Sequence, residues 1–108
     1  MTRQERIKAL ADAVAKDPND SFSRYALALE YAAEGDSAKA VGELKELVAR
    51  DSAYVAAYRQ LGQLQLKLNK TAEAKKFYRK GIELAKDAND LHTQQEMEEE
   101  LEDIEDEW

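Results

Sequence analysis

The sequence predicts an all-α fold of about six helices that stack as antiparallel hairpins. Apolar residues recur at helical spacing along the whole chain, and five short polar breaks interrupt them. Residues of one type return 34 positions later, as Leu27 does at Leu61 and Ala40 does at Ala74, so the chain repeats one structural unit. Only four glycines and one proline occur in 108 residues, which is too few for a β-sandwich with many turns.

The polar breaks carry residues that suit helix ends. Short polar side chains accept hydrogen bonds from the unpaired amides of a helix start, and the candidates for this N-cap role are Asp20, Ser37, Ser52, Thr71 and Asn89. Gly35 and Asn69, 34 positions apart, both tolerate the left-handed conformation that ends a helix. We therefore expect helices at about residues 3–16, 21–34, 38–50, 53–68, 72–86 and 90–107.

The first helix is half of a repeating unit, and the next four helices form two complete units. Apolar residues of the first helix lie 34 positions before those of the third, as Val14 does before Val48. In the complete units, small residues such as Ala28 and Gly62 allow the two helices of a hairpin to approach closely. We expect Leu27, Leu44, Leu61 and Tyr78 to fill the space around the small residues.

The unit resembles the tetratricopeptide repeat, in which large, small and aromatic residues occupy set positions. The matching residues are Leu27, Ala28, Tyr31, Ala40 and Leu44 in residues 21–54, Leu61, Gly62, Ala74 and Tyr78 in residues 55–88, and Pro18 at the end of the truncated first unit. Departures from the pattern are Gln65 in place of an aromatic residue, Leu47 in place of a small one, and Ser52 and Lys86 in place of proline. The match covers about residues 4–88.

This resemblance implies a right-handed superhelical stack of helix hairpins in a single domain, residues 1–108. The expected parts are a half-repeat helix at 1–18, repeats at 21–54 and 55–88, and an acidic capping helix at 89–108. In the capping helix a narrow apolar stripe is surrounded by acids, and the stripe consists of Met97, Leu101, Ile104 and Trp108. Such a polar outer face is what the terminal element of a repeat array needs.

The net charge of −7 comes from one end of the chain. Residues 96–107 hold nine acids and no base, and residues 1–95 carry 14 acids and 16 bases. This near balance disfavours nucleic acid as a partner, because binding to phosphates requires clustered cations. No apolar run is long enough to span a membrane, and the N-terminus lacks the apolar block of a secretory signal. We expect a cytoplasmic protein without membrane contact.

Catalysis is not indicated. The single histidine, His92, has no cysteine and no second imidazole beside it, and the acids near the C-terminus lack the glycine and spacing of a calcium loop. Phosphate-binding glycine loops are also missing. We therefore expect no enzyme activity, no catalytic residues, no metal and no cofactor.

The resemblance implies a concave groove lined by the first helices of the repeats, which binds a peptide or helix of a partner protein. The family's groove positions correspond to Phe22, Tyr25, Leu29, Ala32 and Ala33, and to Ala56, Arg59, Gln63, Leu66 and Lys67. Of these we expect partner contacts from Phe22, Tyr25, Leu29, Arg59, Gln63 and Lys67, which suit an apolar side chain beside an acidic group. The clamp that some relatives use for acidic chaperone tails is absent, since Tyr25, Leu29 and Gln60 replace its lysine and two asparagines.

Two alternatives remain open from the sequence. The C-terminal helix could lie across the groove and bury Phe22, Tyr25 and Leu29 as core. A structural or homodimeric unit could pair through the stripe of Met97, Leu101, Ile104 and Trp108, although the surrounding acids would repel each other. We expect a monomer whose last helix packs on residues 72–86, where cations face the acids: Lys75, Lys76, Arg79, Lys80 and Lys86.

Overall fold

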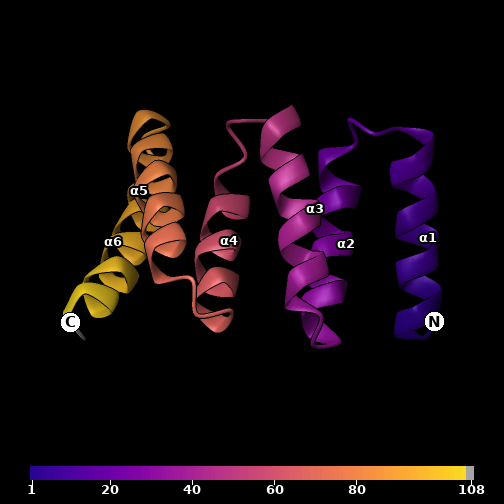
Figure 1. The fold of residues 1–108 in the computed structure, drawn as a ribbon. Helices are drawn as coiled ribbons and strands as arrows, with labels where there is room; N and C mark the ends of the chain where they lie inside the picture. The colour runs from indigo at the N-terminus through magenta and orange to yellow at the C-terminus, as the bar shows by residue number, and fades with distance from the viewer. Residues whose placement is uncertain (107–108) are drawn as a thin grey trace.

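The computed structural model describes residues 1–106, and over that range its helices are joined by short turns without any strand (Figure 1). Its helices are α1 (Arg3–Lys16), α2 (Ser21–Ala33), α3 (Ser37–Arg50), α4 (Val55–Lys67), α5 (Thr71–Asp87) and α6 (Leu91–Asp106). Every predicted boundary within these residues is confirmed to about two positions, and the all-α prediction is confirmed with them. None of the helices in this range combines the length and apolar character that crossing a bilayer requires.

Helix starts are capped mainly by aspartates. The side chain of Asp20 accepts a hydrogen bond from the Ser23 amide at 3.0 Å, and Asp36 does the same for Lys39 at 3.0 Å. The predicted cap Asp20 is confirmed, whereas Ser37 and Thr71 are each the first residue inside a helix. Aspartate is the better cap where it precedes the serine, because its charge also interacts favourably with the helix dipole.

The predictions of Ser52 and Asn89 as N-caps are also wrong. Tyr54 is the N-cap of α4, without a side-chain hydrogen bond. Asn89 ends α5 in the left-handed conformation, with φ of 57°, and Asp90 then accepts the hydrogen bond from the Thr93 amide at 3.2 Å. An asparagine suits either end of a helix, so the sequence pattern could not distinguish the two roles.

One type of turn occurs three times within residues 1–106. Gly35, Asn69 and Asn89 all have positive φ, and each precedes an amide that donates to a carbonyl five residues back, at 2.8–2.9 Å. The first two turns join the helices within a repeat, as expected from their 34-residue offset. The third joins α5 to α6, whereas the second helices of the preceding units end at Asp17 and Asp51, each with a φ of −136°. α6 therefore leaves α5 differently from the way each repeat follows the last.

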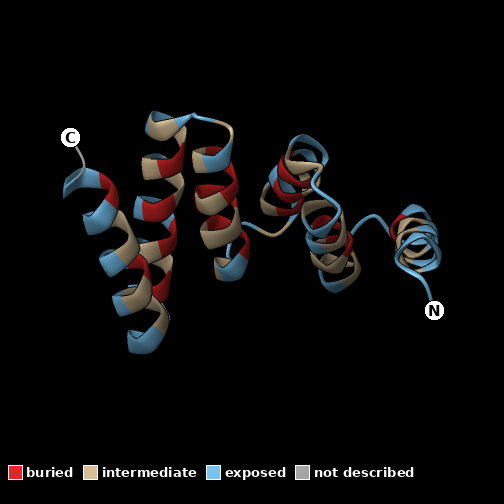
Figure 2. Cartoon of the chain, turned by 90° about the horizontal axis from the view of Figure 1, so that it is seen from below, coloured by how far each residue is buried: buried red, intermediate tan, exposed pale blue. Residues whose placement is uncertain are grey.

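The hairpins stack side by side with their buried residues on the facing sides of the helices (Figures 1 and 2). α2 pairs with α3 and α4 with α5, while α1 packs on α2 and α6 on α5. The expected small residues Ala28, Ala40 and Ala74 are fully buried between helices. At Gly62 a Cβ atom would lie 2.6 Å from the ring of Tyr78, so the absence of a side chain is what lets α4 and α5 meet there.

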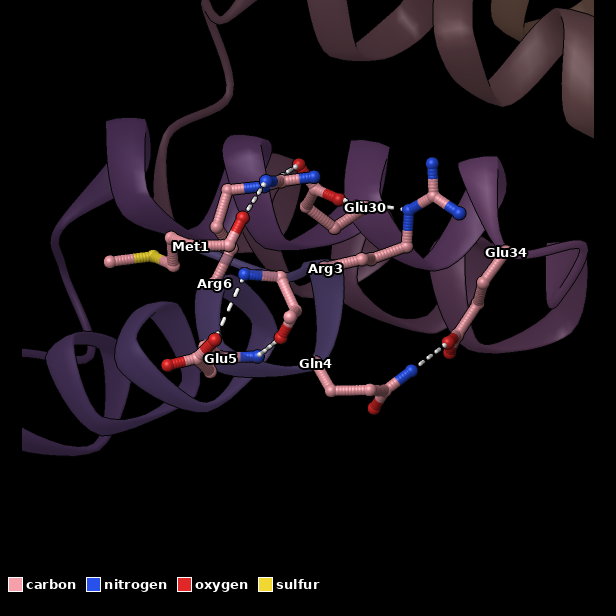
Figure 3. A network of polar contacts seen from close by, with 8 residues as sticks. Met1, Arg3, Gln4, Glu5, Arg6, Glu30 and Glu34 are labelled. Atoms are coloured by element: carbon pink, nitrogen blue, oxygen red, sulfur yellow. Dashed lines mark hydrogen bonds and ion pairs between the residues drawn. The ribbon is translucent and has the colours of Figure 1, made fainter.

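α1 is attached by one buried residue, Val14, and by a polar network at its start (Figure 3). Arg3 and Arg6 both pair with Glu30 of α2, at 3.3 and 3.0 Å, and Gln4 donates to Glu34 at 2.9 Å. Because Val14 is the one buried residue of α1, these polar contacts form a substantial part of its attachment to α2.

Candidate partner-binding groove

The first helices of the two repeats lie along a small groove. Its pocket of about 210 Å³ is lined by Tyr25 of α2, by Val55, Ala56, Arg59 and Gln60 of α4, and by Asp90 and Thr93 at the start of α6. Tyr25 and Tyr54 pack at its edge with ring centroids 5.2 Å apart and planes tilted by 42°. Burial raises the pKa of Tyr25 above its ordinary value, so its hydroxyl stays protonated over the physiological range.

Two of the predicted contact residues lie exposed on the α2 side. Phe22 is 74% exposed and Leu29 is 37% exposed, while Tyr25 between them is half-buried. The interpretation in which the C-terminal helix buries all three as core is therefore wrong for Phe22 and Leu29. Within residues 1–106, α6 reaches the pocket beside Tyr25 with Thr93 of its first turn, and its later residues lie on the α4 side of the groove.

α6 fills the α4 side of the groove with two carboxylates. Arg59 pairs through one guanidinium nitrogen with Glu96 at 3.0 Å and through the other with Glu100. Gln63 donates to Glu100 at 2.9 Å, and the hydroxyl of Tyr78 donates to the same carboxylate oxygen at 2.8 Å. Arg59 and Gln63, expected to contact a partner, are thus engaged inside the chain, and Arg59 is not available as an unpaired cation.

The protonation of this cluster follows from its partners. Burial alone would raise the pKa of Glu100, but hydrogen bonds from Arg59, Gln63 and Tyr78 outweigh it, so the pKa lies below its ordinary value. Burial and the hydrogen bond to Glu100 raise the pKa of Tyr78 far above its usual range. The carboxylate stays charged and the tyrosine stays neutral, which keeps all three donors in place at neutral pH.

The sequence analysis did not identify Glu96 and Glu100 as groove residues. Glu96 and Glu100 are one turn apart on α6, and Arg59 and Gln63 are one turn apart on α4, so the two pairs present matching faces. That matched spacing was the available signal. The nine clustered acids concealed it, because all of them resemble a solvated helix face.

The remaining predicted residues divide between surface and interior. Lys67 is exposed at the end of α4, and it forms no ion pair with any residue in 1–106. Met97 and Ile104 are buried against Tyr58 and Tyr78, and Leu101 is half-buried beside them. Pairing of two chains through this stripe would require α6 to leave its own core. Trp108, the last stripe residue, lies outside the described residues.

The reason expected for the docking of α6 needs correction. The sequence suggested that the cations of α5 hold α6 in place. In the described part of the chain, only Arg79 of those cations reaches an acid of α6, Glu105 at 3.6 Å. α6 is also held by ion pairs with Arg59 of α4 and by the burial of Met97 against Gly81 of α5. The prediction that α6 packs on α5 is therefore right, but the α5 cations that motivated it contribute little to the contact.

In the part of the chain that the structure describes, no metal-binding cluster accompanies the groove. His92 contacts Glu96 one turn away on the exposed side of α6. Across residues 1–106 there is no cluster of three or more histidine, aspartate or glutamate side chains that could hold a metal ion.

Comparisons with known proteins find the same 34-residue helical repeat that the sequence suggested. The model of the tetratricopeptide repeat family matches residues 1–95. The solution structure of a tetratricopeptide repeat domain protein from Salinibacter ruber is 35% identical, with a TM-score of 0.77 over 82% of this chain and 90% of that one. A crystal structure of the tetratricopeptide repeat domain protein from the same organism is 34% identical, with a TM-score of 0.75 over 80% and 96% of the two chains.

More distant structures share the fold alone. A crystal structure of MamA is 24% identical with a TM-score of 0.79, and the match covers 82% of this chain and 52% of MamA. A protein from Bordetella parapertussis is 21% identical with a TM-score of 0.81, over 94% and 88% of the chains. A search of curated proteins finds no match. Because the family model matches residues 1–95 of the 108, this chain belongs to the tetratricopeptide repeat family.

Proposed function

We propose that this chain is a non-catalytic interaction module that binds a segment of a partner protein along α2, in the open half of the groove. The observation that carries the proposal is the exposure of Phe22 at 74%, one turn from the half-buried Tyr25 and two turns from the exposed Leu29. Apolar residues at this spacing form one continuous strip on a helix. A single exposed apolar residue needs no explanation, whereas a strip beside a pocket suits a ligand.

The chemistry of the groove limits the partner. The pocket of about 210 Å³ beside Tyr25 has room for one side chain. Val55 and Ala56 give it apolar walls, and its other lining residues are polar: Arg59, Gln60, Asp90 and Thr93. Arg59 is neutralised by Glu96 and Glu100, so it no longer favours an acidic group at the centre of the groove. Lys67 is the remaining predicted cation, at the far end of α4. We expect a partner segment with two apolar anchors and, at most, one acid at the Lys67 end.

A peptide selection tests this proposal. Peptides selected from a random display library against the purified chain are titrated into the ¹⁵N-labelled protein, and amide shifts are followed by NMR. We expect the shifts at α2 and the start of α4, and we expect Phe22→Asp with Leu29→Asp to weaken binding at least tenfold. The matched control is Ala38→Asp, on the exposed side of α3. Shifts confined to α3 and α5, or binding unaffected by the double variant, would refute the site.

A further inference from the structure

The outward side of the last helix pair has two adjacent hollows of opposite charge. The acidic hollow, about 490 Å³, lies between α5 and α6 and is lined by Arg79, Ile82, Glu98, Leu101, Glu102, Glu105 and Asp106. The basic hollow, about 550 Å³, is lined by Thr71, Ala72, Lys75, Lys76 and Arg79 of α5. Arg79 lines both, so the hollows lie side by side.

The charges of these hollows are poorly neutralised inside the chain. In the range 1–106, Glu98, Glu102 and Lys75 take part in no ion pair. Lys76 reaches only Glu73 on its own helix, at 3.8 Å. The pair of Arg79 and Glu105, at 3.6 Å, marks the boundary between the two hollows. Acids thus gather on one side of this pair and bases on the other.

The same surface has an apolar component. Ile82 and Leu101, both half-buried, line the acidic hollow, and the basic hollow is lined by the aliphatic stems of its lysines together with Thr71 and Ala72. α5 and α6 lie at the end of the stack opposite α1 (Figure 1), and no helix of the described range packs on their outward side. The surface therefore offers apolar area as well as charge.

We propose that two copies of this chain associate through these hollows, around a two-fold axis near the Arg79–Glu105 pair. A two-fold interface uses the same surface on both copies. That surface must therefore carry an acidic region and a basic region side by side, so that each faces its opposite on the other copy. The two hollows meet that condition, because Lys75 and Lys76 of each copy enter the acidic hollow of the other. A partner of one charge would occupy only one hollow, whereas a second copy fills both.

This association is independent of the groove on α2. None of the groove residues lines either hollow. It also differs from pairing through the buried stripe, since Met97 and Ile104 keep their places in the core. A dimer formed in this way presents two grooves at once.

Sedimentation velocity across a range of concentrations tests the proposal. At low salt we expect the mass to rise from 12.2 kDa towards twice that value, and raising the salt to about 0.5 M should weaken association because screening shortens the range of the charges. Wild-type protein that stays at 12.2 kDa at all concentrations would overturn the proposal.

A charge-swap experiment identifies the surface. Lys75→Glu with Lys76→Glu makes both hollows acidic, and Glu98→Lys with Glu102→Lys makes both basic. Each double variant alone should associate at least tenfold more weakly than the wild type, and an equimolar mixture should recover the dimer, because every facing pair is then opposite in charge. The control, Lys8→Glu with Lys45→Glu, makes the same charge change at exposed positions on α1 and α3. A mixture that stays monomeric, or a control as weak as the first variant, contradicts the proposal.

Discussion

Gly62 and Gly42 are both inside helices, yet alanine should have opposite effects at the two positions. At Gly62 an added Cβ would lie 2.6 and 2.7 Å from two carbons of the Tyr78 ring. Tyr78 is fully buried, and its hydroxyl is held by Glu100 at 2.8 Å, so the ring has little freedom to move aside. At Gly42, on the exposed side of α3, an added Cβ meets nothing within 4 Å.

The two free-energy changes can be estimated separately. Replacing a helical glycine by alanine stabilises the helix by about 1 kcal/mol, and this is the whole expected effect at Gly42. Overpacking a close helix contact costs about 1–3 kcal/mol, and a 2.6 Å approach to an anchored ring lies at the upper end of that range. We therefore expect Gly62→Ala to lower the free energy of unfolding by about 2 kcal/mol, after the gain in helix propensity is included.

Urea unfolding followed by circular dichroism at 222 nm measures both variants. With a denaturant slope of about 2 kcal/mol per molar, Gly62→Ala should lower the urea midpoint by about 1 M and Gly42→Ala should raise it by about 0.5 M. The two variants have the same covalent change, so helix propensity and the unfolded chain are matched. If Gly62→Ala raised the midpoint as Gly42→Ala does, the close contact of α4 with the Tyr78 ring would be refuted.

Three further variants or conditions test other parts of the structure. Gln65 is 1% exposed, and neither amide atom has a hydrogen-bond partner in the described residues, so Gln65→Met should raise the free energy of unfolding by about 1 kcal/mol, as a thermal melt would show. The pKa of Glu100 is lower in the folded chain than its ordinary value of 4.5, so its contribution is present above that pH and is lost as the pH falls through the lowered value. Glu100→Gln should therefore make the free energy of unfolding fall less steeply as the pH is lowered below 4.5 in acid titrations, and an unchanged slope would contradict the cluster. In a double-mutant cycle, Arg59→Met and Glu100→Gln should show a coupling of about 1 kcal/mol, larger than that of the exposed Lys76–Glu73 pair.

Much of the fold was predictable because residues with the same packing role recur 34 positions apart. Leu27 and Leu61 occupy the same packing site in successive units, as do Ala40 and Ala74, so each site is indicated by two independent positions. The turns at Gly35 and Asn69 were predictable for the same reason. That Asp36 and not Ser37 is the N-cap of α3 was not predictable, because both residue types suit the N-cap position.

The groove was predictable only in part, because half of it is built by α6, which does not repeat. The third occurrence of the left-handed turn, at Asn89, changes how α6 leaves α5, and no 34-residue offset predicts that change. α6 then places Glu96 and Glu100 on Arg59, while Met97 packs on Gly81. Phe22 and Leu29 stay exposed because α6 packs on α5 and not on α2, which depends on three-dimensional packing and not on the residues of α2.

The division of the groove into a filled half and an open half is tested most directly by nuclear Overhauser effects in the isotopically labelled chain. We predict cross-peaks from the Met97 methyl group to Gly81 and to Tyr58, and none from the Phe22 ring to any residue of α6. Contacts between the Phe22 ring and α6, or a Met97 methyl group without either neighbour, would contradict this arrangement.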